Sequence, residues 1–425
     1  MNTIEKYKQY VNVSFVKAVE PIVVAKASGS KVTDEEGKVY TDLYAGIAVA
    51  NAGHNNPEVA AAAKAQIDKL VHCCSYVYHS IPVADYAEML AQNTPGRLQK
   101  TFFGNGGAEA NEGAMRMAKQ FTKKQEFIAL QGSFHGRSLA TLSITGNKDR
   151  KKGGGPYIPG VAFHPAPYCY RCPYDKTYPA CDMHCAKMLE KTIQYDTSGN
   201  VAAFIAETMM GEGGIIIPPK EYYKEVKKVL DKHEILLFLD EVQCGFGRSG
   251  KFCAIDHYGV EPDIMTFAKG IADGFPLSAF IARPEIADSF KPGDHLSTFG
   301  GNPVSCAAGI ANLNFLLREK IPEKALAKGE RVMGELKDLQ KKFPLIGEVR
   351  GSGLMIGLEL VRDAAKTPAA EEAGKIKAMM RQKGFLIGAG GTYGNVLRMQ
   401  PPLVISSEEL SAAVAALAEC FKELG

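Results

Sequence analysis

Two short runs in the segment 235–276 constrain the fold of this chain more than any other feature, because each leads into a charged residue. Residues 235–239 are all apolar and are followed by Asp240, and a second strand-like run, 263–267, is closely followed by Lys269. Runs of this kind are typical of parallel strands that are buried on both faces. The carboxyl ends of such strands meet at one edge of the sheet, where ligands bind in open α/β folds. We therefore predict that Asp240 and Lys269 face a common crevice.

Asp240 and Lys269 together suit the chemistry of pyridoxal phosphate (PLP). A lysine amine can form a Schiff base with the aldehyde of this cofactor, and a carboxylate can keep its ring nitrogen protonated. Each residue also has a plainer interpretation, because Asp240 could cap a helix and most lysines lie on the surface. Gly270, Gly274 and Pro276 favour the cofactor, since they predict a loop that permits close approach of the backbone.

The sequences DEVQCGFGRSG (240–250) and FAKGIADGFP (267–276) resemble those of class-III aminotransferases of the 4-aminobutyrate, ornithine and acetylornithine group. The resemblance implies that Lys269 carries the Schiff base, that Asp240 pairs with the ring nitrogen, and that Gln243 donates to the 3-hydroxyl group of the cofactor. It also implies the α/β fold of PLP-dependent transferases of fold type I. That fold has a large domain with a mostly parallel sheet of the seven-stranded type and a smaller α+β domain.

The composition argues against several other classes of protein. The 425 residues, of which 46% are hydrophobic, are enough for two or three domains with an ample core. A net charge of +3 and the lack of long basic runs argue against a nucleic-acid partner. The sequence has no 18-residue apolar run, and its N-terminus lacks the apolar core of a signal peptide. We therefore expect a cytoplasmic protein without a membrane partner, whose ten cysteines are mostly reduced and buried.

Sequence pattern and resemblance together divide the chain into three parts. Residues 1–60 are expected to form an N-terminal segment that joins the small domain, residues 61–315 the large PLP-binding domain, and residues 316–425 the C-terminal small domain. Helices are predicted at 57–71, 220–232, 322–342 and 408–422, and strands at 101–104, 126–130, 201–207, 277–282, 353–360, 385–387 and 396–399.

The segment 104–118 is a glycine-rich turn that opens a helix, and the free backbone N–H groups at the start of a helix can bind a phosphate. Turns of this kind are also common where no ligand binds. Related sequences have a serine where this chain has Gly106. Gly107 and Ala108 are therefore expected to donate to the PLP phosphate from the backbone.

Residues 132–137, with the sequence GSFHGR, follow a predicted strand. Phe134 is expected to stack on the PLP ring, although a phenylalanine is more often part of the core. The resemblance implies that Arg137 holds the distal carboxylate of the substrate. A guanidinium suits this role because it forms two parallel hydrogen bonds with a carboxylate. His135 is interpreted as a structural residue.

Two acids and a second arginine belong to the same expected site. Glu207 ends the predicted strand 201–207 and is expected to contribute to cofactor binding. By resemblance, Glu212 pairs with Arg398 when no dicarboxylate is bound. An internal carboxylate that can move away allows one arginine to bind a substrate in one half-reaction and to be neutralised in the other.

Two further residues are assigned by resemblance. Ile47, in the glycine-dotted segment 42–57, corresponds to a position that contacts the substrate. The segment itself either covers the cofactor or forms a buried strand and turn. Thr298 corresponds to a residue that reaches the cofactor phosphate of the other subunit. We therefore expect a homodimer with shared active sites.

Four cysteines and His184 lie close together in residues 169–185, CYRCPYDKTYPACDMHC. Their spacing could ligate zinc or an iron–sulfur cluster. The segment could equally be a surface loop whose thiols are reduced or paired. We predict no metal site.

We expect an aminotransferase that moves an amino group from an ω-amino acid, similar to 4-aminobutyrate or ornithine, to 2-oxoglutarate through a PLP ping-pong cycle. Arg137 and Arg398 would bind the two carboxylates of this acceptor. Two alternatives stay open. One is a PLP-dependent amino-acid racemase or epimerase that uses the same lysine and acid, and the other is a class-III aminotransferase that uses pyruvate or glyoxylate.

Overall fold

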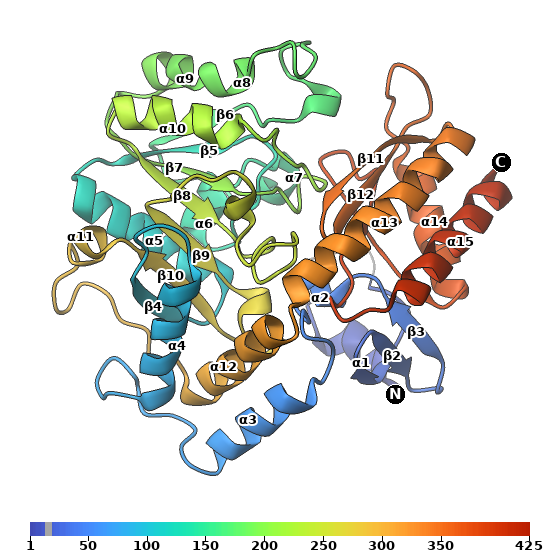
Figure 1. The fold of residues 1–425 in the computed structure, drawn as a ribbon, viewed down its shortest axis with the longest axis horizontal. Helices are drawn as coiled ribbons and strands as arrows, with labels where there is room; N and C mark the ends of the chain where they lie inside the picture. The colour runs from blue at the N-terminus through green and yellow to red at the C-terminus, as the bar shows by residue number, and fades with distance from the viewer. Residues whose placement is uncertain (13–18) are drawn as a thin grey trace.

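A seven-stranded sheet is the largest sheet in the computed structural model, which describes residues 1–12 and 19–425 (Figure 1). The strand order is β4-β10-β9-β8-β7-β5-β6. The strands are β4 (Lys100–Gly104), β5 (Glu126–Leu130), β6 (Val161–His164), β7 (Val201–Glu207), β8 (Leu236–Asp240), β9 (Ile264–Phe267) and β10 (Ser278–Ala282). β10 is antiparallel to both of its neighbours, and the other strands run parallel to one another. The predicted mostly parallel α/β sheet is confirmed.

The central strands β7, β8 and β9 are buried on both faces, which explains their continuous apolar sequences. Successive residues of a strand point to opposite faces. Phe204 and Leu237 accordingly pack in one core cluster with the apolar side of α10 (Tyr222–Lys232), and Ile205 and Phe238 pack in a second cluster with α5 (Gly107–Thr122).

The strand register aligns the carboxyl ends of the central strands. Glu207 lies beside Asp240, and Asp240 lies beside Thr266. Lys269 follows β9 by two residues, in a short 3-10 helix, η3 (Lys269–Ile271). The two residues that the sequence placed at the edge of a sheet therefore share that edge.

The smaller part of the molecule contains two four-stranded sheets. One is antiparallel, with the order β11-β12-β15-β14, and the other has the order β1-β2-β3-β13. β13 pairs in parallel with β3, so the N-terminal strands share a sheet with a strand from the C-terminal part. These strands are β1 (Val24–Ser28), β2 (Lys31–Asp34), β3 (Val39–Asp42), β11 (Ile346–Ser352), β12 (Met355–Leu360), β13 (Phe385–Leu386), β14 (Gly388–Gly390) and β15 (Val396–Met399). The predicted smaller α+β domain is confirmed, and the boundaries at residues 60 and 315 stay predictions.

Helices cover both parts (Figure 1). The smaller part carries α13 (Ile321–Lys342), α14 (Ala370–Gln382) and α15 (Ser407–Leu424), while α12 (Pro303–Arg318) packs against α3 (Pro57–Ile67) and α4 (Ile81–Asn93). The remaining helical segments are α1 (Thr3–Tyr10), α2 (Ala45–Ala48), α6 (Leu139–Ile144), α7 (Lys148–Lys151), η1 (Cys169–Arg171), α8 (His184–Lys187), α9 (Leu189–Asp196), η2 (Ala254–His257) and α11 (Pro284–Ala287).

Several predicted elements differ from the observed ones. The helix predicted at 57–71 ends at Ile67, and no prediction covered the helix α4. The strand predicted at 353–360 begins only at Met355, because the preceding residues form the turn of the β11–β12 hairpin. The strand predicted at 385–387 is confirmed as β13, which ends one residue earlier, at Leu386. Ile387 lies between β13 and β14, which starts at Gly388 and belongs to a different sheet.

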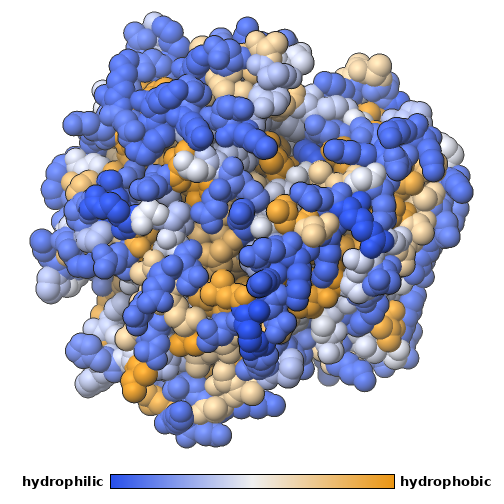
Figure 2. Space-filling model, in the orientation of Figure 1, coloured by the Kyte–Doolittle hydropathy of each residue, from blue (hydrophilic) through white to orange (hydrophobic). Residues whose placement is uncertain are grey.

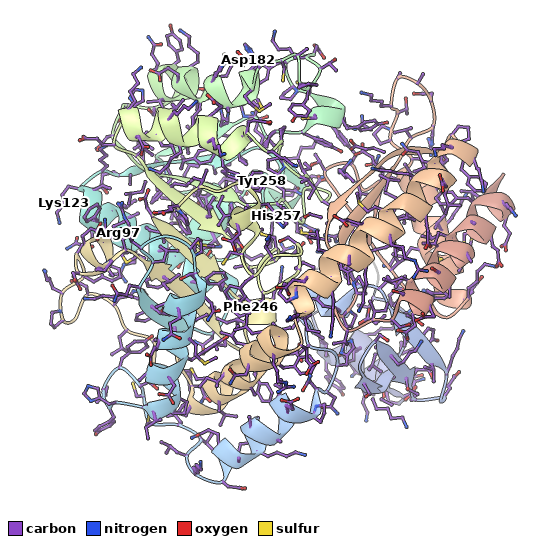
Figure 3. The ribbon with its side chains drawn as sticks, viewed as in Figure 1. Arg97, Lys123, Asp182, Phe246, His257 and Tyr258 are labelled. Carbon is purple, nitrogen blue, oxygen red and sulfur yellow. The ribbon has the colours of Figure 1, made fainter. Side chains whose placement is uncertain are left out.

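The surface is mostly hydrophilic on the face shown in Figure 2, with hydrophobic residues in separate patches. Charged side chains such as Arg97, Lys123 and Asp182 lie at the periphery, whereas Phe246 and Tyr258 lie in the interior (Figure 3). Within the part of the chain that the structure describes, none of the helices has both the length and the apolar sequence that crossing a bilayer requires.

The packing of α13 against a neighbouring loop leads to a stability prediction. A Cβ atom at Gly329 would lie 1.9 Å from the backbone oxygen of Gly353, so Gly329→Ala must displace main chain. We expect a loss of about 1–3 kcal/mol in the free energy of unfolding. Gly334, on the same helix, is exposed, and a Cβ there would meet no described atom within 4 Å. Gly334→Ala should therefore stabilise the helix by roughly 0.5–1 kcal/mol. Thermal unfolding of both variants checks this, and equal effects would contradict it.

Candidate active site

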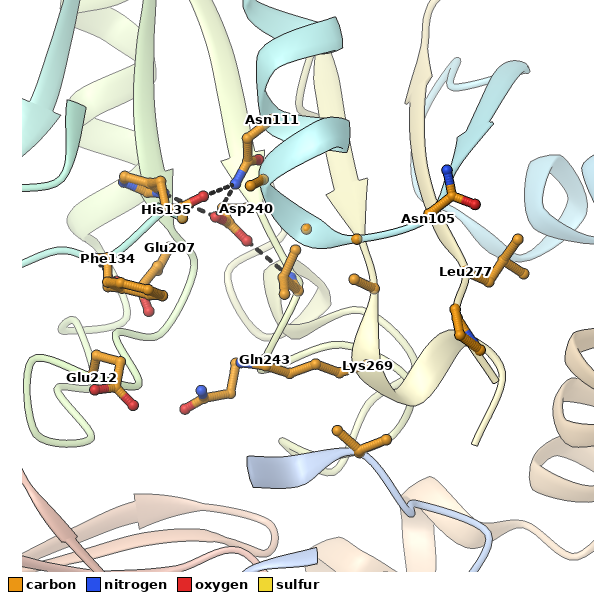
Figure 4. Close-up of a pocket in the computed structure, with 18 of the residues that line it drawn as sticks. Asn105, Asn111, Phe134, His135, Glu207, Glu212, Asp240, Gln243, Lys269 and Leu277 are labelled. Atoms are coloured by element: carbon orange, nitrogen blue, oxygen red, sulfur yellow. Dashed lines mark hydrogen bonds and ion pairs between the residues drawn. The ribbon is translucent and has the colours of Figure 1, made fainter. Parts of the chain in front are cut away.

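A cavity of about 330 Å³ lies at the carboxyl edge of the large sheet (Figure 4). Phe134 and Glu212 lie on one side of it, Asn105 and Leu277 on the other, and Asp240 and Lys269 between them. Its lining also includes Val49, Gly106, Gly107, Ala108, Asn111, His135, Glu207, Val242, Gln243 and Ala268. Eight of the residues predicted for the site from the sequence are thus found around one cavity: Gly107, Ala108, Phe134, Glu207, Glu212, Asp240, Gln243 and Lys269.

The carboxylate of Asp240 is buried and held by three donors. Its Oδ2 atom accepts from Asn111 Nδ2 and from His135 Nδ1, both at 2.8 Å. Its Oδ1 atom accepts from the backbone N–H of Val242 at 3.0 Å. Because a carboxylate only accepts, the proton in the His135 contact belongs to Nδ1. The orientation of this carboxylate is therefore fixed from three directions.

Asn111 and His135 are the partners that the sequence analysis missed. Asn111 also donates to the backbone oxygen of His135 and accepts from Thr266 Oγ1, so the three residues form one network with Asp240. Asn111 lies four residues after Gly107 in α5, hence on the same helix face, and this spacing could have identified it. His135 was interpreted as structural, and the structure gives it a direct contact with Asp240.

Glu207 holds two loops of the cavity wall in place. Its Oε1 atom accepts from the backbone N–H of Phe134 at 2.9 Å, and its Oε2 atom accepts from that of Gly211 at 2.8 Å. Burial raises the pKa of Glu207 to about 7. Through these contacts Glu207 fixes the backbone of Phe134 and the loop that carries Glu212.

Lys269 has a left-handed backbone, with φ of 50°. Burial lowers the pKa of its amine, although the charges of Glu212 and Asp240 oppose this effect. A lower pKa leaves more of the amine unprotonated, and this is the form that attacks an aldehyde.

The side-chain amide of Gln243 packs closely against Gly211. A Cβ atom at Gly211 would lie 1.8 Å from Gln243 Oε1. The same oxygen accepts from Gln400 Nε2 at 3.1 Å. A side chain at position 211 would therefore displace the amide of Gln243, which lines the cavity.

Glu212 pairs with two arginines. Its Oε1 atom lies 2.7 Å from Arg398 Nη1, and its Oε2 atom lies 2.9 Å from Arg150 Nη2. Arg398 also donates to the hydroxyl of Tyr44 at 2.7 Å. Burial opposes the charged form of Glu212, but Arg398, Arg150 and Lys269 outweigh it and lower its pKa to about 2. Arg150 was missed in the sequence, where it lies among the basic residues of 148–152 without any distinguishing pattern.

Four predicted residues lie outside the cavity lining: Arg398, which pairs with the lining residue Glu212, and Arg137, Thr298 and Ile47. Arg137 is exposed, and its guanidinium lies 5.5 Å from the centre of the Phe134 ring. Thr298 is in an exposed loop. Ile47 is half-buried, and Val49 from the same segment lines the cavity instead.

The segment that carries Ile47 has an unusual backbone. Ala45, Gly46, Ile47 and Ala48 form a left-handed turn, with φ values of 50°, 61°, 71° and 59°. L-residues other than glycine seldom adopt this conformation, least of all a β-branched one. Asp42 supports the turn, because its Oδ1 atom accepts from the backbone N–H groups of Tyr44 and Ala45. Backbone strain of this kind is concentrated at functional sites.

The cysteine-rich segment 169–185 lies apart from this cavity. All of its thiols are free, and within residues 1–12 and 19–425 no three His, Cys, Asp or Glu side chains are grouped closely enough to hold a metal. Burial raises the pKa of both Cys169 and Cys185 to about 11, with smaller contributions from the neighbouring thiols. These two thiols are therefore protonated at neutral pH.

The sequence profile of the family described as "Aminotransferase class-III" matches residues 14–421. The chain is a class-III aminotransferase. An acetylornithine aminotransferase of Methanothermobacter thermautotrophicus (strain Delta H) is 40% identical over 422 residues, which cover 99% of this chain and 98% of that protein. A leucine/methionine racemase of Thermococcus litoralis is 37% identical over 423 residues, which cover 99% and 95%.

A solved aminotransferase structure from Bacillus anthracis is similar to this one over 100% of both chains, with a TM-score of 0.93 and 34% identity. The predicted family, fold type and PLP-dependent aminotransferase activity are confirmed.

The residues of this class-III aminotransferase fit PLP. α5 is 16 residues long and begins at the cavity with Gly107 and Ala108, whose N–H groups lie at the positive end of the helix. Asp240 supplies an oriented carboxylate and Lys269 an amine. The cavity therefore contains donors suited to a phosphate, an acid suited to a protonated ring nitrogen and a nucleophile suited to an aldehyde.

The cap position of α5 leads to a second prediction. Gly106 has an extended backbone (φ −148°, ψ 160°), and a Cβ atom there would meet no described atom within 4 Å. Gly106→Ser should add one hydroxyl donor beside the phosphate site without a clash. We expect this variant to bind PLP with an about 5-fold lower Kd, because one hydrogen bond contributes about 1 kcal/mol.

Gly106→Ala is the matched control, since it adds the Cβ atom without the hydroxyl. Fluorescence titration of the PLP-free protein measures both values of Kd. A serine that only caps the helix would raise the unfolding temperature of the PLP-free protein and leave the Kd for PLP unchanged. That result would contradict a phosphate site at Gly106.

Proposed function

We propose that this enzyme transfers the amino group of an ω-amino acid to 2-oxoglutarate, in a homodimer whose active sites are shared. The observation that supports this most is the ion pair between Glu212, which lines the cavity, and Arg398. Arg398 is buried, and a buried guanidinium needs a negative partner. Glu212 provides one while the substrate has a carboxylate at one end only. An acceptor with two carboxylates can itself provide the negative partner of Arg398.

Each carboxylate of 2-oxoglutarate then has a proposed partner. Arg137 would bind the carboxylate that is distant from the reacting carbon, and Arg398 would bind the one next to it after Glu212 has moved aside. An ω-amino acid has one carboxylate, for Arg137, and leaves the Glu212–Arg398 pair closed. The acetylornithine aminotransferase relative supports a donor of this kind, because the free amine of acetylornithine is on the terminal carbon.

The proposed roles of the other residues follow from their positions. Lys269 removes the proton from the amine-bearing carbon of the donor and later releases it as an acid. Asp240, held by Asn111 and His135, keeps a negative charge beside the ring nitrogen. Gly107 and Ala108 hold the phosphate through backbone N–H groups, and Phe134 and Gln243 orient the ring and its hydroxyl group. When bound, PLP supplies an aldehyde and a ring that accepts electrons.

The homodimer is supported by an exposed apolar surface formed by the segments 70–81 and 295–302. The two segments contact each other, because Ser75 Oγ donates to the backbone oxygen of Gly301 at 2.7 Å. Together they expose the large apolar side chains of Leu70, Val71, Val77, Tyr78, Ile81, Leu296 and Phe299. Exposed groups of this size mark interaction surfaces. Thr298 lies within this surface, where a second copy of the chain would bring it towards another active site.

Half-reactions measured separately test the proposed substrates. Arg398→Gln should slow the reaction with 2-oxoglutarate at least 10-fold and change the reaction with 4-aminobutyrate less than 3-fold, because only the former needs this guanidinium. Arg137→Gln should slow both, and Glu212→Gln should slow the 4-aminobutyrate reaction more than the glutamate reaction. Single-turnover absorbance changes of the PLP-loaded enzyme measure each rate.

Equal losses in both half-reactions of Arg398→Gln would contradict the proposal. Faster turnover with pyruvate or glyoxylate than with 2-oxoglutarate would favour the other kind of class-III aminotransferase. The 37% identity to a leucine/methionine racemase keeps a racemase as the second candidate. Incubation with one L-amino acid and no oxo acid distinguishes a racemase from an aminotransferase, since only a racemase would then destroy the optical activity of the amino acid.

The proposed homodimer predicts the mass of the protein in solution and the effect of a charge in its interface. The protein should sediment at twice its chain mass of 45.9 kDa. Phe299→Asp should shift it to the monomer, because it puts a charge into the proposed apolar interface. Tyr195→Asp alters a side chain of similar exposure on α9, outside this surface, and should leave the dimer intact. A fully active parent monomer in sedimentation velocity would refute the shared sites.

A further inference from the structure

The two carboxylate oxygens of Glu212 are divided between two arginines. Oε1 lies 2.7 Å from Arg398 and Oε2 lies 2.9 Å from Arg150. The side chain of Glu212 is only 8% exposed and that of Arg398 4%, whereas Arg150 is 28% exposed, at the outer side of the site. Glu212 can therefore lose one partner and keep the other.

Arg150 belongs to the same structural unit as the loop of Phe134. It lies in the short helix α7, whose cap residue Asn147 accepts from the N–H of Asp149 through its side chain and from that of Arg150 through its backbone oxygen. The N–H of Asn147 in turn donates to the backbone oxygen of Ser133 at 3.1 Å. The backbone position of Arg150 is thus fixed relative to the cavity wall by main-chain hydrogen bonds.

The proposed function requires Glu212 to leave Arg398 whenever a dicarboxylate binds. A buried carboxylate that loses its only cation becomes strongly unfavourable, and this would weaken binding of the dicarboxylate by the same free energy. A cation on the second oxygen removes most of this penalty, because Glu212 stays paired in both states.

We propose that Arg150 is a positioning residue that holds Glu212 when a dicarboxylate takes Arg398, and that it thereby determines the affinity for dicarboxylate substrates relative to ω-amino acids. Arg150 acts through Glu212 and not by touching the substrate. This inference rests on the proposed exchange of partners at Arg398.

Binding of glutarate to the PLP-loaded enzyme tests the inference without turnover, because glutarate has the two carboxylates of 2-oxoglutarate and no reactive carbonyl group. By calorimetry, Arg150→Gln should raise the Kd for glutarate at least 10-fold, and Arg150→Lys should recover part of the loss. The Michaelis constant for the donor 4-aminobutyrate should change less than 3-fold. Lys148→Gln removes a charge from an exposed position of the same helix and should have less than a 2-fold effect.

The Arg150→Gln change made in the Glu212→Gln variant shows whether Arg150 acts through Glu212 or binds the ligand directly. Gln at position 212 carries no charge that needs a cation, so in Glu212→Gln the further change Arg150→Gln should leave the Kd for glutarate within 2-fold. An equal loss in both backgrounds would show that Arg150 binds the ligand itself and would overturn the proposal. So would an unchanged Kd in the folded Arg150→Gln single variant, with folding checked by thermal unfolding.

The Kd of Arg398→Gln for glutarate distinguishes an error in the proposed substrates from an error in the role of Arg150. If Arg398→Gln left the Kd for glutarate unchanged, Arg398 would not bind a dicarboxylate, and the substrate assignment would be wrong. If Arg398→Gln raised the Kd and Arg150→Gln did not, the substrate assignment would stand and only the role of Arg150 would be wrong.

Discussion

The buried carboxylate of Asp240 is the interaction on which the rest of the site depends. A charge removed from water is strongly unfavourable unless hydrogen-bond donors surround it. Its donors come from three segments: Asn111 in α5, His135 in the loop after β5, and the backbone of Val242 after β8. Because all three must meet at one carboxylate, the start of α5 and the loop that carries Phe134 are fixed at the edge of the sheet. The proposed phosphate and ring contacts take their positions from that requirement.

The loop that carries Glu212 is fixed from two directions. On the side of the large sheet, Glu207 accepts from the backbone N–H of Gly211. On the side of the sheet β11-β12-β15-β14, Arg350 of β11 donates to the backbone oxygens of Gly214 and Ile215. The ion pair of Glu212 with Arg398 joins the same two parts directly. The electrostatics of the site therefore depend on how the two parts pack, and a shift between them would separate charges that are buried.

The sequence was most informative where burial dictates composition. Strands buried on both faces need continuous apolar runs, and a charged residue after such a run identifies the ligand edge, as it does for Asp240 and Lys269. Helix α4 was not predicted, because it buries only two of its thirteen residues and its apolar periodicity is weak. The roles of His135 and Arg150 could not be predicted either. They lie 105 and 62 residues from Asp240 and Glu212, and such contacts depend on tertiary packing alone.

The left-handed turn at residues 45–48 has a consequence for how this chain can vary. Three of its four residues are not glycine, and each costs roughly 1–2 kcal/mol in this conformation. Their sum is a sizeable fraction of the ~5–15 kcal/mol net stability of a folded domain. A mirror-image D-alanine would adopt this backbone without strain, and among encoded residues glycine comes closest. Substitutions that favour right-handed helices therefore oppose the observed conformation here. The chirality of L-amino acids thus limits which residues this segment can tolerate.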